Sequence, residues 1–243
     1  MIIINADDWG RSPAVTDAAL SCYREGRITS VTAMVFMEDS KRAADLARDA
    51  GIDVGLHLNL TQRFTGGYRS GLLKEYHDRI VRFLTLSRYS QIIYNPTLRK
   101  QFQYVFQAQV EEFLRLYGKP PSHIDGHHHM HLCANILLDR VIPTDAKVRR
   151  NLTFWPGEKG LLNRTYRRIV DQWLARRYHL TDYFFALSQC LQSDRLRRVG
   201  VLSKSATVEL MTHPANANEY AFLMSDEYFA MLGGLEKRTY SAL

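Results

Sequence analysis

The hydrophobic pattern of the chain predicts strands that alternate with helices. Short apolar runs rich in Val, Ile and Thr are followed by longer stretches with apolar residues at helical spacing, and Ser, Asp, Gly and Pro mark many boundaries. The predicted strands are residues 2–6, 28–36, 53–60, 122–127, 147–152, 182–187 and 207–211. The predicted helices are residues 13–25, 40–51, 97–116, 132–141 and 161–178. Such alternation is typical of parallel βαβ units.

The predicted elements suit one domain. At 243 residues with 46% hydrophobic side chains, the chain is long enough for a large core, and no repeat or linker divides it. We therefore expect a single α/β domain, residues 1–243, folded as an irregular (β/α) barrel of TIM-barrel-like architecture, with an open doubly wound sheet as the alternative. Residues 62–96, with several glycines and aromatic side chains, interrupt the rhythm and are predicted to be an insertion over the active face.

The N-terminus and the cysteines predict a cytoplasmic protein. No run approaches the roughly 18 apolar residues of a membrane span, and the chain passes from Ile2 to Asp7 without a basic region or a cleavage site. Cys22, Cys133 and Cys190 are widely spaced, which predicts reduced thiols and neither a disulfide framework nor a Cys-based zinc site.

The net charge of +7 is concentrated in residues 147–204. That segment has 13 Lys and Arg against 4 Asp and Glu, an excess of +9, which leaves −2 for the rest of the chain. Its arginines recur on a predicted amphipathic helix, at Arg164, Arg167, Arg168, Arg176 and Arg177. A solvated helix face is the default interpretation of such a pattern. We expect no nucleic-acid partner, although an anionic partner is compatible with this segment.

Five of the nine histidines fall within residues 123–131. Imidazole is the commonest metal ligand and titrates near neutral pH, so the cluster predicts a metal site or acid–base chemistry, with a surface loop as the alternative. A histidine tag would be terminal and unbroken, whereas Asp125 and Met130 interrupt this internal run. On a strand, His123, Asp125 and His127 share one face. One ion usually takes three or four protein groups, so further ligands must come from elsewhere.

Four predicted strands end in groups that suit metal-dependent hydrolysis. These are Asp7 with Asp8, His57, the cluster at 127–131, and His213. In a parallel barrel the C-terminal strand ends open at one mouth, so the groups are expected to converge. A carboxylate and two imidazoles can hold a divalent cation, a second carboxylate can take a proton from water, and a further histidine can protonate a leaving group. Adjacent strand residues point to opposite sides, so Asp7 and Asp8 both reach the site only through a turn.

Four separated segments resemble, in order, the motifs of the YdjC-like carbohydrate deacetylases, the family of chitooligosaccharide deacetylase. They are Asn5-Ala6-Asp7-Asp8-Trp9-Gly10, Gly55-Leu56-His57-Leu58-Asn59-Leu60-Thr61, His123-Ile124-Asp125-Gly126-His127-His128-His129-Met130-His131 and Thr212-His213-Pro214. The resemblance implies an irregular (β/α) barrel that removes acetyl groups from N-acetylated sugars with a divalent metal. Carried over by position, it implies the following roles: metal ligands Asp8, His57 and His127, general base Asp7, and general acid His213.

We therefore expect a metal-dependent hydrolase that removes an acetyl group from an N-acetylated carbohydrate by attack of metal-bound water. The resemblance implies magnesium, whereas one carboxylate and two imidazoles suit zinc at least as well, so one divalent ion, Mg or Zn, is expected. Two alternatives stay open. One is a metal phosphoesterase acting on an anionic substrate, and the other is a catalytically silent sugar-binding protein of the same fold. A homo-oligomer is compatible with the sequence.

Other residues are expected to support the metal ligands or to contact substrate. Asp125 is the best candidate to accept a ring N–H from a neighbouring histidine, because such bonds orient metal-ligating rings. Supporting or packing roles are expected for His128, His129 and His131. Aromatic residues of the insertion are predicted to line or cover the sugar site, with ordinary packing as the alternative; they are Phe64, Tyr68, Tyr76 and Tyr89.

Overall fold

A computed structural model describes residues 1–67, 70–192 and 194–243, and its internal contacts group the chain into two compact units. Unit 1 comprises Met1–Ala6, Ala18–Ser30 and Thr144–Leu243, and unit 2 comprises Asp7–Asp17 and Val31–Pro143. Strand β1 (Ile2–Trp9) and strand β2 (Ser30–Ala33) each contribute residues to both units. Within the described residues, no helix is both long and apolar enough to span a membrane.

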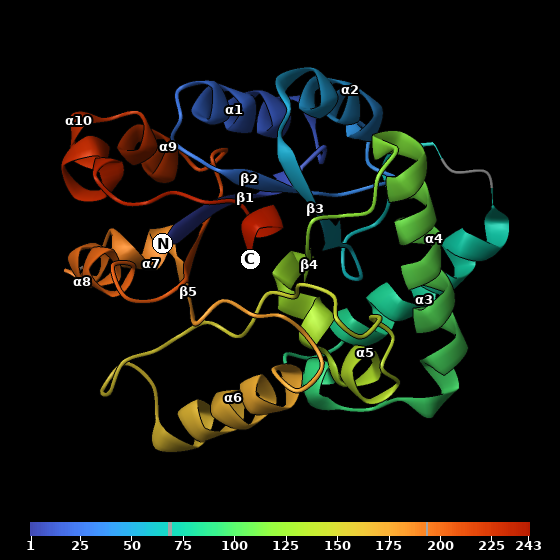
Figure 1. The fold of residues 1–243 in the computed structure, drawn as a ribbon. Coiled ribbons are helices and arrows are strands. Elements are labelled where there is room, and N and C mark those ends of the chain that lie inside the picture. Colours follow the sequence, from blue (N-terminus) through green and yellow to red (C-terminus); the bar gives the residue numbers. More distant parts are fainter. Residues whose placement is uncertain (68–69, 193) are drawn as a thin grey trace. The chain divides into compact units, whose positions relative to one another are not determined.

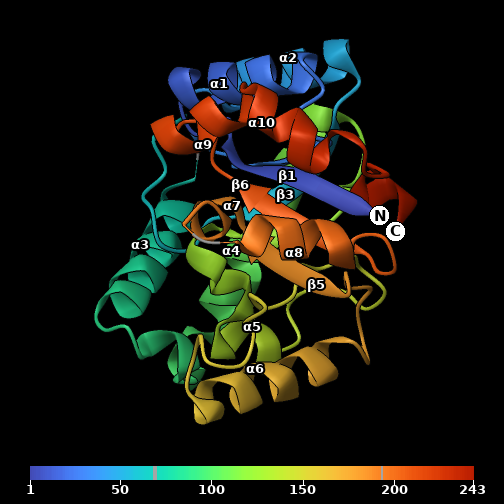
Figure 2. The ribbon, with the colours of Figure 1, turned by 90° about the vertical axis from the view of Figure 1, so that its left-hand side faces the viewer.

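Unit 1 is built on parallel strands in the order β1, β6, β5. Its own strands are β5 (Tyr183–Ala186) and β6 (Val208–Thr212), and Ile2 and Ile4 of β1 align with Val208 and Leu210. These apolar strand residues are fully buried, so the sheet forms the core of this unit. Its helices are α6 (Leu161–Leu174), α7 (Leu187–Cys190), α8 (Arg195–Leu202), α9 (Ala217–Leu223) and α10 (Asp226–Tyr228). Helix α7 packs against β5 and β6 (Figure 2).

Unit 2 continues the strand order from β1 through β2 and β3 to β4. Strands β3 (Asp53–Leu58) and β4 (Ile124–Gly126) are parallel, and His57 stands opposite Asp125 in their register. The helices are α1 (Pro13–Arg24, shared with unit 1), α2 (Ser40–Ala50), α3 (Gly71–Thr85), α4 (Arg99–Tyr117) and α5 (Ala134–Leu138). Helix α4 packs against both α2 and α3 (Figure 1). A turn at His127–Leu132, the histidine turn, follows β4 directly.

Most predicted elements are present within a few residues of their expected ends. Helix α2 ends where Gly51 adopts a left-handed conformation with φ 66°, as its predicted role as a stop signal requires. The strand predicted for 147–152 is wrong, because its backbone pairs with His179 through a single isolated bridge at Lys147. In that segment the side chain of Arg149 is fully buried and its Nη2 lies 2.7 Å from Oε1 of Glu209.

The segment predicted as an insertion, 62–96, contains helix α3, which the sequence pattern did not predict. Ser70 caps this helix by accepting a hydrogen bond from the N–H of Leu73. Its buried residues are Leu73, His77, Ile80 and Leu84, which are spaced three or four residues apart. A buried histidine within this stripe, and the glycines before it, obscured the helical period.

Candidate metal centre

Three of the predicted metal-ligating side chains meet in unit 2. Oδ1 of Asp8 lies 2.9 Å from Nδ1 of His127 and 3.3 Å from Nε2 of His57. All three residues are buried. Oδ1 of Asp8 is also buried and makes no hydrogen bond of normal geometry. The three ligand atoms therefore lie close enough together to share one ion.

The strands of unit 2 explain why His57 and His127 converge. Because His57 stands opposite Asp125 in the β3–β4 register, its Nδ1 lies 2.7 Å from Oδ1 of Asp125. A ring N–H donated there would leave Nε2 of His57, which lies beside Asp8, as the nitrogen that could hold an ion. His127 is the first residue after β4, at the C-terminal end of the neighbouring strand.

Asp7 and Asp8 reach the site together because the backbone of β1 adopts a left-handed conformation at Asp8. Asp8 has φ 68°, in the left-handed region that few residues other than glycine, Asn and Asp adopt. This conformation breaks the strict alternation of side chains along a strand, as two adjacent aspartates that both reach the site require. A carboxylate oxygen of Asp7 consequently belongs to a second ligand group with His57 and Asp125, whose ligand atoms lie within 4.8 Å of one another.

The charges in this cluster are strongly coupled. Burial alone would raise the pKa of Asp8, but the imidazoles of His127 and His57 hold it well below its ordinary value. Burial alone would lower the pKa of His57, but the carboxylates of Asp125 and Asp7 raise it to about 10. Three buried carboxylates therefore surround His57, and they favour a positive charge at this point of the fold.

These residues fit a divalent cation. Oxygen and nitrogen ligands lie about 2.0–2.2 Å from zinc, so two ligands of one ion are separated by about 3 Å, as Asp8 is from each imidazole. The buried oxygen of Asp8 without a normal hydrogen bond would gain a partner from the ion. The bond from His57 to Asp125 is the carboxylate–histidine arrangement that orients metal-ligating rings.

Three residues around this cluster were not identified from the sequence. Nη1 of Arg11 donates to Oδ2 of Asp8 at 2.9 Å, and the hydroxyl of Thr32 donates to Oδ1 of Asp7 at 3.2 Å. The hydroxyl of Thr61 lies 3.0 Å from Nδ1 of His128. Thr61 lies inside a recognised motif, and Arg11 follows another directly. Thr32 carries no signal beyond its place on a predicted strand.

The other histidines of the cluster occupy a tight turn. His128 and His129 have φ 54° and 60°, and the ring of His128 lies 4.0 Å from the ring of His127. Gly126 allows the turn to fold back, because a Cβ there would lie 2.8 Å from the backbone nitrogen of His131. His131 is fully buried. His128 is more exposed, but its partial burial still lowers its pKa. The supporting roles expected for these histidines stay predictions.

The aromatic residues of 62–94 are divided between packing and exposure. Phe64 stacks on His77 with ring centroids 3.8 Å apart, and Tyr76 meets Tyr104 edge-on at 5.4 Å. Tyr89 is 53% exposed. Tyr68 lies outside the described residues, so its predicted contact with substrate stays a prediction.

His213 belongs to unit 1, whereas the other predicted site residues named above belong to unit 2. It follows β6, as predicted, and its backbone N–H donates to Oε2 of Glu219 at 2.8 Å. Its Nδ1 lies 3.9 Å from Oε1 of the same buried carboxylate. Its role as a general acid stays a prediction.

Comparison with known families shows to which family the chain belongs. The model of the family described as "YdjC-like protein" matches residues 1–233. The chain belongs to this YdjC-like family. The resemblance inferred from four sequence motifs is therefore confirmed over nearly the whole chain, and Asp8, His57 and His127 all lie inside the matched region.

Named relatives of the YdjC-like chain are carbohydrate deacetylases. It is 29% identical to the carbohydrate deacetylase of Vibrio campbellii, over 97% of this chain and 85% of that protein. It is 28% identical to the chitooligosaccharide deacetylase of Proteus mirabilis, over 100% of this chain and 92% of the relative. A carbohydrate deacetylase of Mus musculus is 25% identical over 88% of this chain and 77% of its own length.

A solved structure shows the same fold. The chain resembles a crystal structure from Enterococcus faecalis, of a protein named for a proposed role in cellobiose-phosphate cleavage, with a TM-score of 0.68 and 19% sequence identity. The likeness covers 99% of this chain and 97% of that one. It confirms the predicted TIM-barrel-like α/β fold of this YdjC-like chain.

Proposed function

We propose that the protein is a metal-dependent carbohydrate deacetylase that hydrolyses the N-acetyl group of an N-acetylated sugar. The observation that carries this proposal is the convergence of Asp8, His57 and His127 on one point. A further buried carboxylate, Asp7, faces the same imidazole of His57. The substrate class is suggested by the names of relatives that match most of the chain.

Different residues would hold the ion and move the proton. Asp8, His57 and His127 would hold one divalent cation, which would polarise the acetyl carbonyl and lower the pKa of the attacking water. Asp7 would act as the general base, since its Oδ1 is held by Thr32 and its carboxylate belongs to the neighbouring ligand group around His57. Asp125 fixes the ring of His57 through Nδ1.

His213 is proposed to protonate the departing amine. Support comes from its position in the Thr212-His213-Pro214 motif and from Glu219, which holds the backbone of this segment. Thr212 donates to the same oxygen of Glu219 at 2.8 Å, so the buried carboxylate fixes two successive residues. The backbone that carries the His213 imidazole is thereby fixed, and imidazole is the side chain best suited to proton transfer near neutral pH.

The chemical types of the three proposed ligands indicate which metal ions the site would prefer. Two imidazoles and one carboxylate suit zinc and other transition ions, whereas magnesium prefers carboxylate, carbonyl and water oxygens. The site is therefore proposed to take either Mg or Zn, with the nitrogen donors favouring Zn. Activity regained by the metal-stripped protein with each ion in turn separates the two.

The proposal is tested by incubating the purified protein with a panel of N-acetylated sugars and candidate divalent ions and assaying free acetate. We expect acetate from at least one N-acetylated sugar, with little release after chelation. Asp49→Asn, which changes an exposed carboxylate in α2, serves as the matched control for variants of the cluster. Metal binding without acetate from any sugar would contradict the proposal and favour a sugar-binding protein.

The phosphoesterase alternative has a distinct signature. A two-metal phosphoesterase holds its ions about 3.5–4 Å apart. The two ligand groups found among the described residues share His57, whose Nδ1 is engaged by Asp125. This arrangement favours one ion. Two bound ions per chain, with phosphate released from esters and no acetate from sugars, would favour that alternative.

A further inference from the structure

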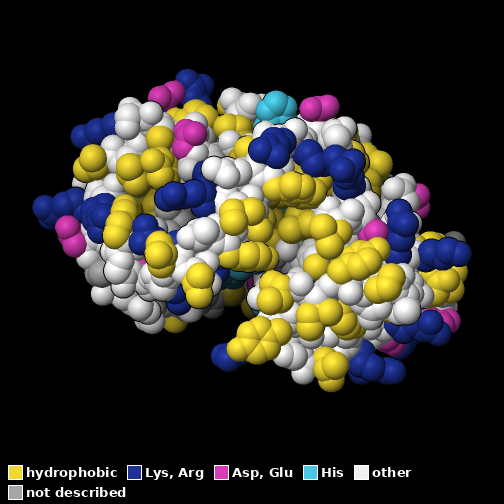
Figure 3. Space-filling view, turned by 90° about the horizontal axis from the view of Figure 1, so that it is seen from below, with side chains coloured by type: hydrophobic (Ala, Val, Ile, Leu, Met, Phe, Trp, Pro, Cys, Tyr) yellow, Lys and Arg dark blue, Asp and Glu magenta, His cyan; other side chains and the backbone are white. Residues whose placement is uncertain are grey.

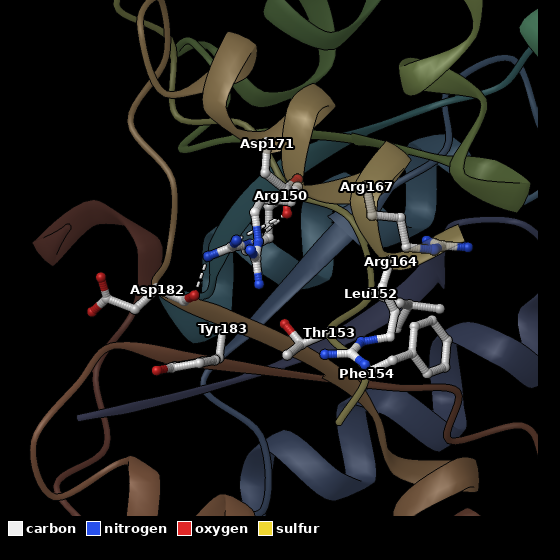
Figure 4. A pocket seen from close by; sticks show the side chains of 10 residues that line it. Arg150, Leu152, Thr153, Phe154, Arg164, Arg167, Asp171, Asp182 and Tyr183 are labelled. Carbon is white, nitrogen blue, oxygen red and sulfur yellow. Dashed lines mark hydrogen bonds and ion pairs between the residues drawn. The ribbon is translucent and has the colours of Figure 1, made fainter. Parts of the chain in front are cut away.

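Unit 1 contains a cavity of about 260 Å³ whose ten lining residues include four arginines. Its walls come from helix α6, from the segment that precedes α6 and from the start of β5 (Figure 4). The cationic lining residues are Arg150, Arg164, Arg167 and Arg168. We call this cavity the arginine pocket. None of its residues belongs to the metal centre.

Helix α6 places its charged and apolar residues in an unusual way. Arg164 and Arg167 are half-buried and line the pocket, whereas Leu161, Leu162 and Ile169 are 75%, 88% and 60% exposed. The expectation of a fully solvated arginine face is therefore wrong for these two arginines. A partly desolvated guanidinium is costly unless an anion accompanies it, so the arrangement needs a compensating negative charge.

The carboxylates of the pocket are already engaged. Oδ2 of Asp171 lies 2.9 Å from Nη2 of Arg150, and its Oδ1 accepts hydrogen bonds from the backbone and side chain of Asn151, each at 3.0 Å. Oδ2 of Asp182 accepts from the backbone N–H of Thr207 at 2.8 Å, and Arg150 also donates to the carbonyl of Asp182 (Figure 4). In the described parts of the chain, neither carboxylate makes an ion pair with an arginine of α6.

The α6 arginines themselves are not neutralised. In the part of the chain that the structure describes, the guanidinium groups of Arg164 and Arg168 have no ion pair and no hydrogen bond. Arg167 is held by neutral partners, with Nε donating to Oδ1 of Asn163 at 2.9 Å and Cζ 5.1 Å from the ring of Phe154. Burial lowers the pKa of Arg167, and the nearby carboxylate of Asp171 offsets this effect only in part.

The geometry favours a small ligand with a phosphate group. Guanidinium groups bind phosphate oxygens through paired N–H donors, and residues at spacings of three and four on a helix present such donors on one face. Phe154 and Tyr183 add aromatic walls to the same cavity. Nucleic acid needs an extended basic track, whereas the face in Figure 3 shows Lys and Arg side chains interspersed with hydrophobic ones.

We propose that the arginine pocket binds a phosphate group, either as inorganic phosphate or as the phosphate of a phosphorylated small molecule, through Arg164, Arg167 and Arg168. Phosphate oxygens supply the negative charge that Asp171 and Asp182 do not. The aromatic walls distinguish the two sources, because Phe154 and Tyr183 contact an attached organic group and contribute nothing to inorganic phosphate.

The test is isothermal titration calorimetry of the metal-loaded protein, in phosphate-free buffer, with inorganic phosphate, glucose 6-phosphate and glucose. We expect both anions to bind and glucose not to bind. Tighter binding of glucose 6-phosphate than of phosphate identifies an organic phosphate as the preferred source, and equal binding identifies phosphate itself. Arg164→Gln and Arg168→Gln should each weaken the binding of both anions by about tenfold or more, since each removes charged hydrogen bonds.

The matched control is Arg176→Gln, an exposed arginine of the same basic segment that does not line the pocket. It should bind as wild type does, and far-UV circular dichroism checks that every variant is folded. The proposal is overturned if neither anion binds, or if the Arg164 and Arg168 variants bind as tightly as wild type, which would place the phosphate elsewhere, for example on the metal. Binding of a short single-stranded oligonucleotide without binding of either small anion would also overturn it.

Discussion

The metal centre of unit 2 and the arginine pocket of unit 1 are both clusters of ionisable side chains, but the fold builds them differently. Asp8, His57 and His127 are buried at strand ends, and the bond of His57 to Asp125 is fixed by strand register. Arg164 and Arg167 are half-buried on a helix beside an irregular segment. Strand register fixes the relative positions of side chains closely, whereas a helix face fixes only their direction. The first cluster suits an ion with strict geometry, and the second suits a larger anion.

The largest effect is expected from the base of the metal centre. Asp7→Asn should lower kcat by about 10²- to 10⁴-fold, the usual range for a positioned proton transfer. Its metal content should stay near that of wild type, because Asp7 is not among the three proposed ligands. Steady-state kinetics and metal analysis measure both quantities. A normal kcat would show that the carboxylate beside His57 is not the base.

His213 tests the general acid. His213→Gln should lower kcat by about 10²-fold or more for a poorly leaving amine, without changing metal content. The loss should be smaller for a substrate whose amine leaves easily, because that amine needs less protonation. Equal losses on both substrates would point to a structural role through Glu219.

Asp125 tests whether orientation of the ring matters. Asp125→Asn keeps the shape of the side chain but removes the charge that Nδ1 of His57 faces at 2.7 Å. We expect metal affinity to fall by about 10- to 100-fold, the range for carboxylates that orient metal-ligating histidines. Competition with a chelator of known affinity measures this change. An unchanged affinity would mean that strand register alone orients His57.

His77 is a buried histidine whose pKa shifts in the opposite direction to that of His57. Burial lowers the pKa of His77 to about 4, and the carbonyl of Asn59 and the nearby carboxylate of Asp78 offset this only in part. The unfolded chain binds a proton near pH 6.5, so the contribution of His77 to stability is complete above that pH and is lost as the pH falls towards 4.

The resulting change is measured by urea unfolding at pH 7 and pH 5. Between these values wild type should lose about 2 kcal/mol more unfolding free energy than His77→Gln does. Glutamine has no titratable proton but retains a donor for the carbonyl of Asn59. An equal loss in both proteins would contradict the neutral, buried state of His77.

The sequence predicted most of unit 2's metal centre because its residues lie at the ends of apolar strands. The buried run 2–6 and the strands that carry His57 and Asp125 follow from the hydrophobic pattern, whereas the register that places these two residues opposite each other is seen only in the structure. The turn at Asp8 was required by two adjacent aspartates and is present as a left-handed φ of 68°. By contrast, the donors Arg11 and Thr32 depend on side-chain positions in three dimensions, which a linear pattern does not contain.

Predictions from the hydrophobic pattern failed where charged side chains are buried or half-buried and apolar side chains are exposed. The apolar Leu161 and Leu162 lie outside while Arg164 lines a cavity, so helical periodicity gave the correct element with the wrong exposed face. Residues 147–152 alternate like a strand, yet Arg149 is buried because Glu209 neutralises it. For Arg149 an electrostatic partner, and not hydrophobicity, decides that the side chain is buried.

The central claim, that Asp8 holds a metal while Asp7 moves a proton, is tested most directly by metal stoichiometry after dialysis. We measure bound metal per chain for wild type, Asp7→Asn, Asp8→Asn and the control Asp49→Asn. The account predicts that only Asp8→Asn loses metal, with activity partly restored at high metal concentration. If Asp7→Asn loses its metal while Asp8→Asn keeps it, the two roles must be exchanged. If both variants keep full metal and full activity, this aspartate pair is only a turn and the proposed mechanism is wrong.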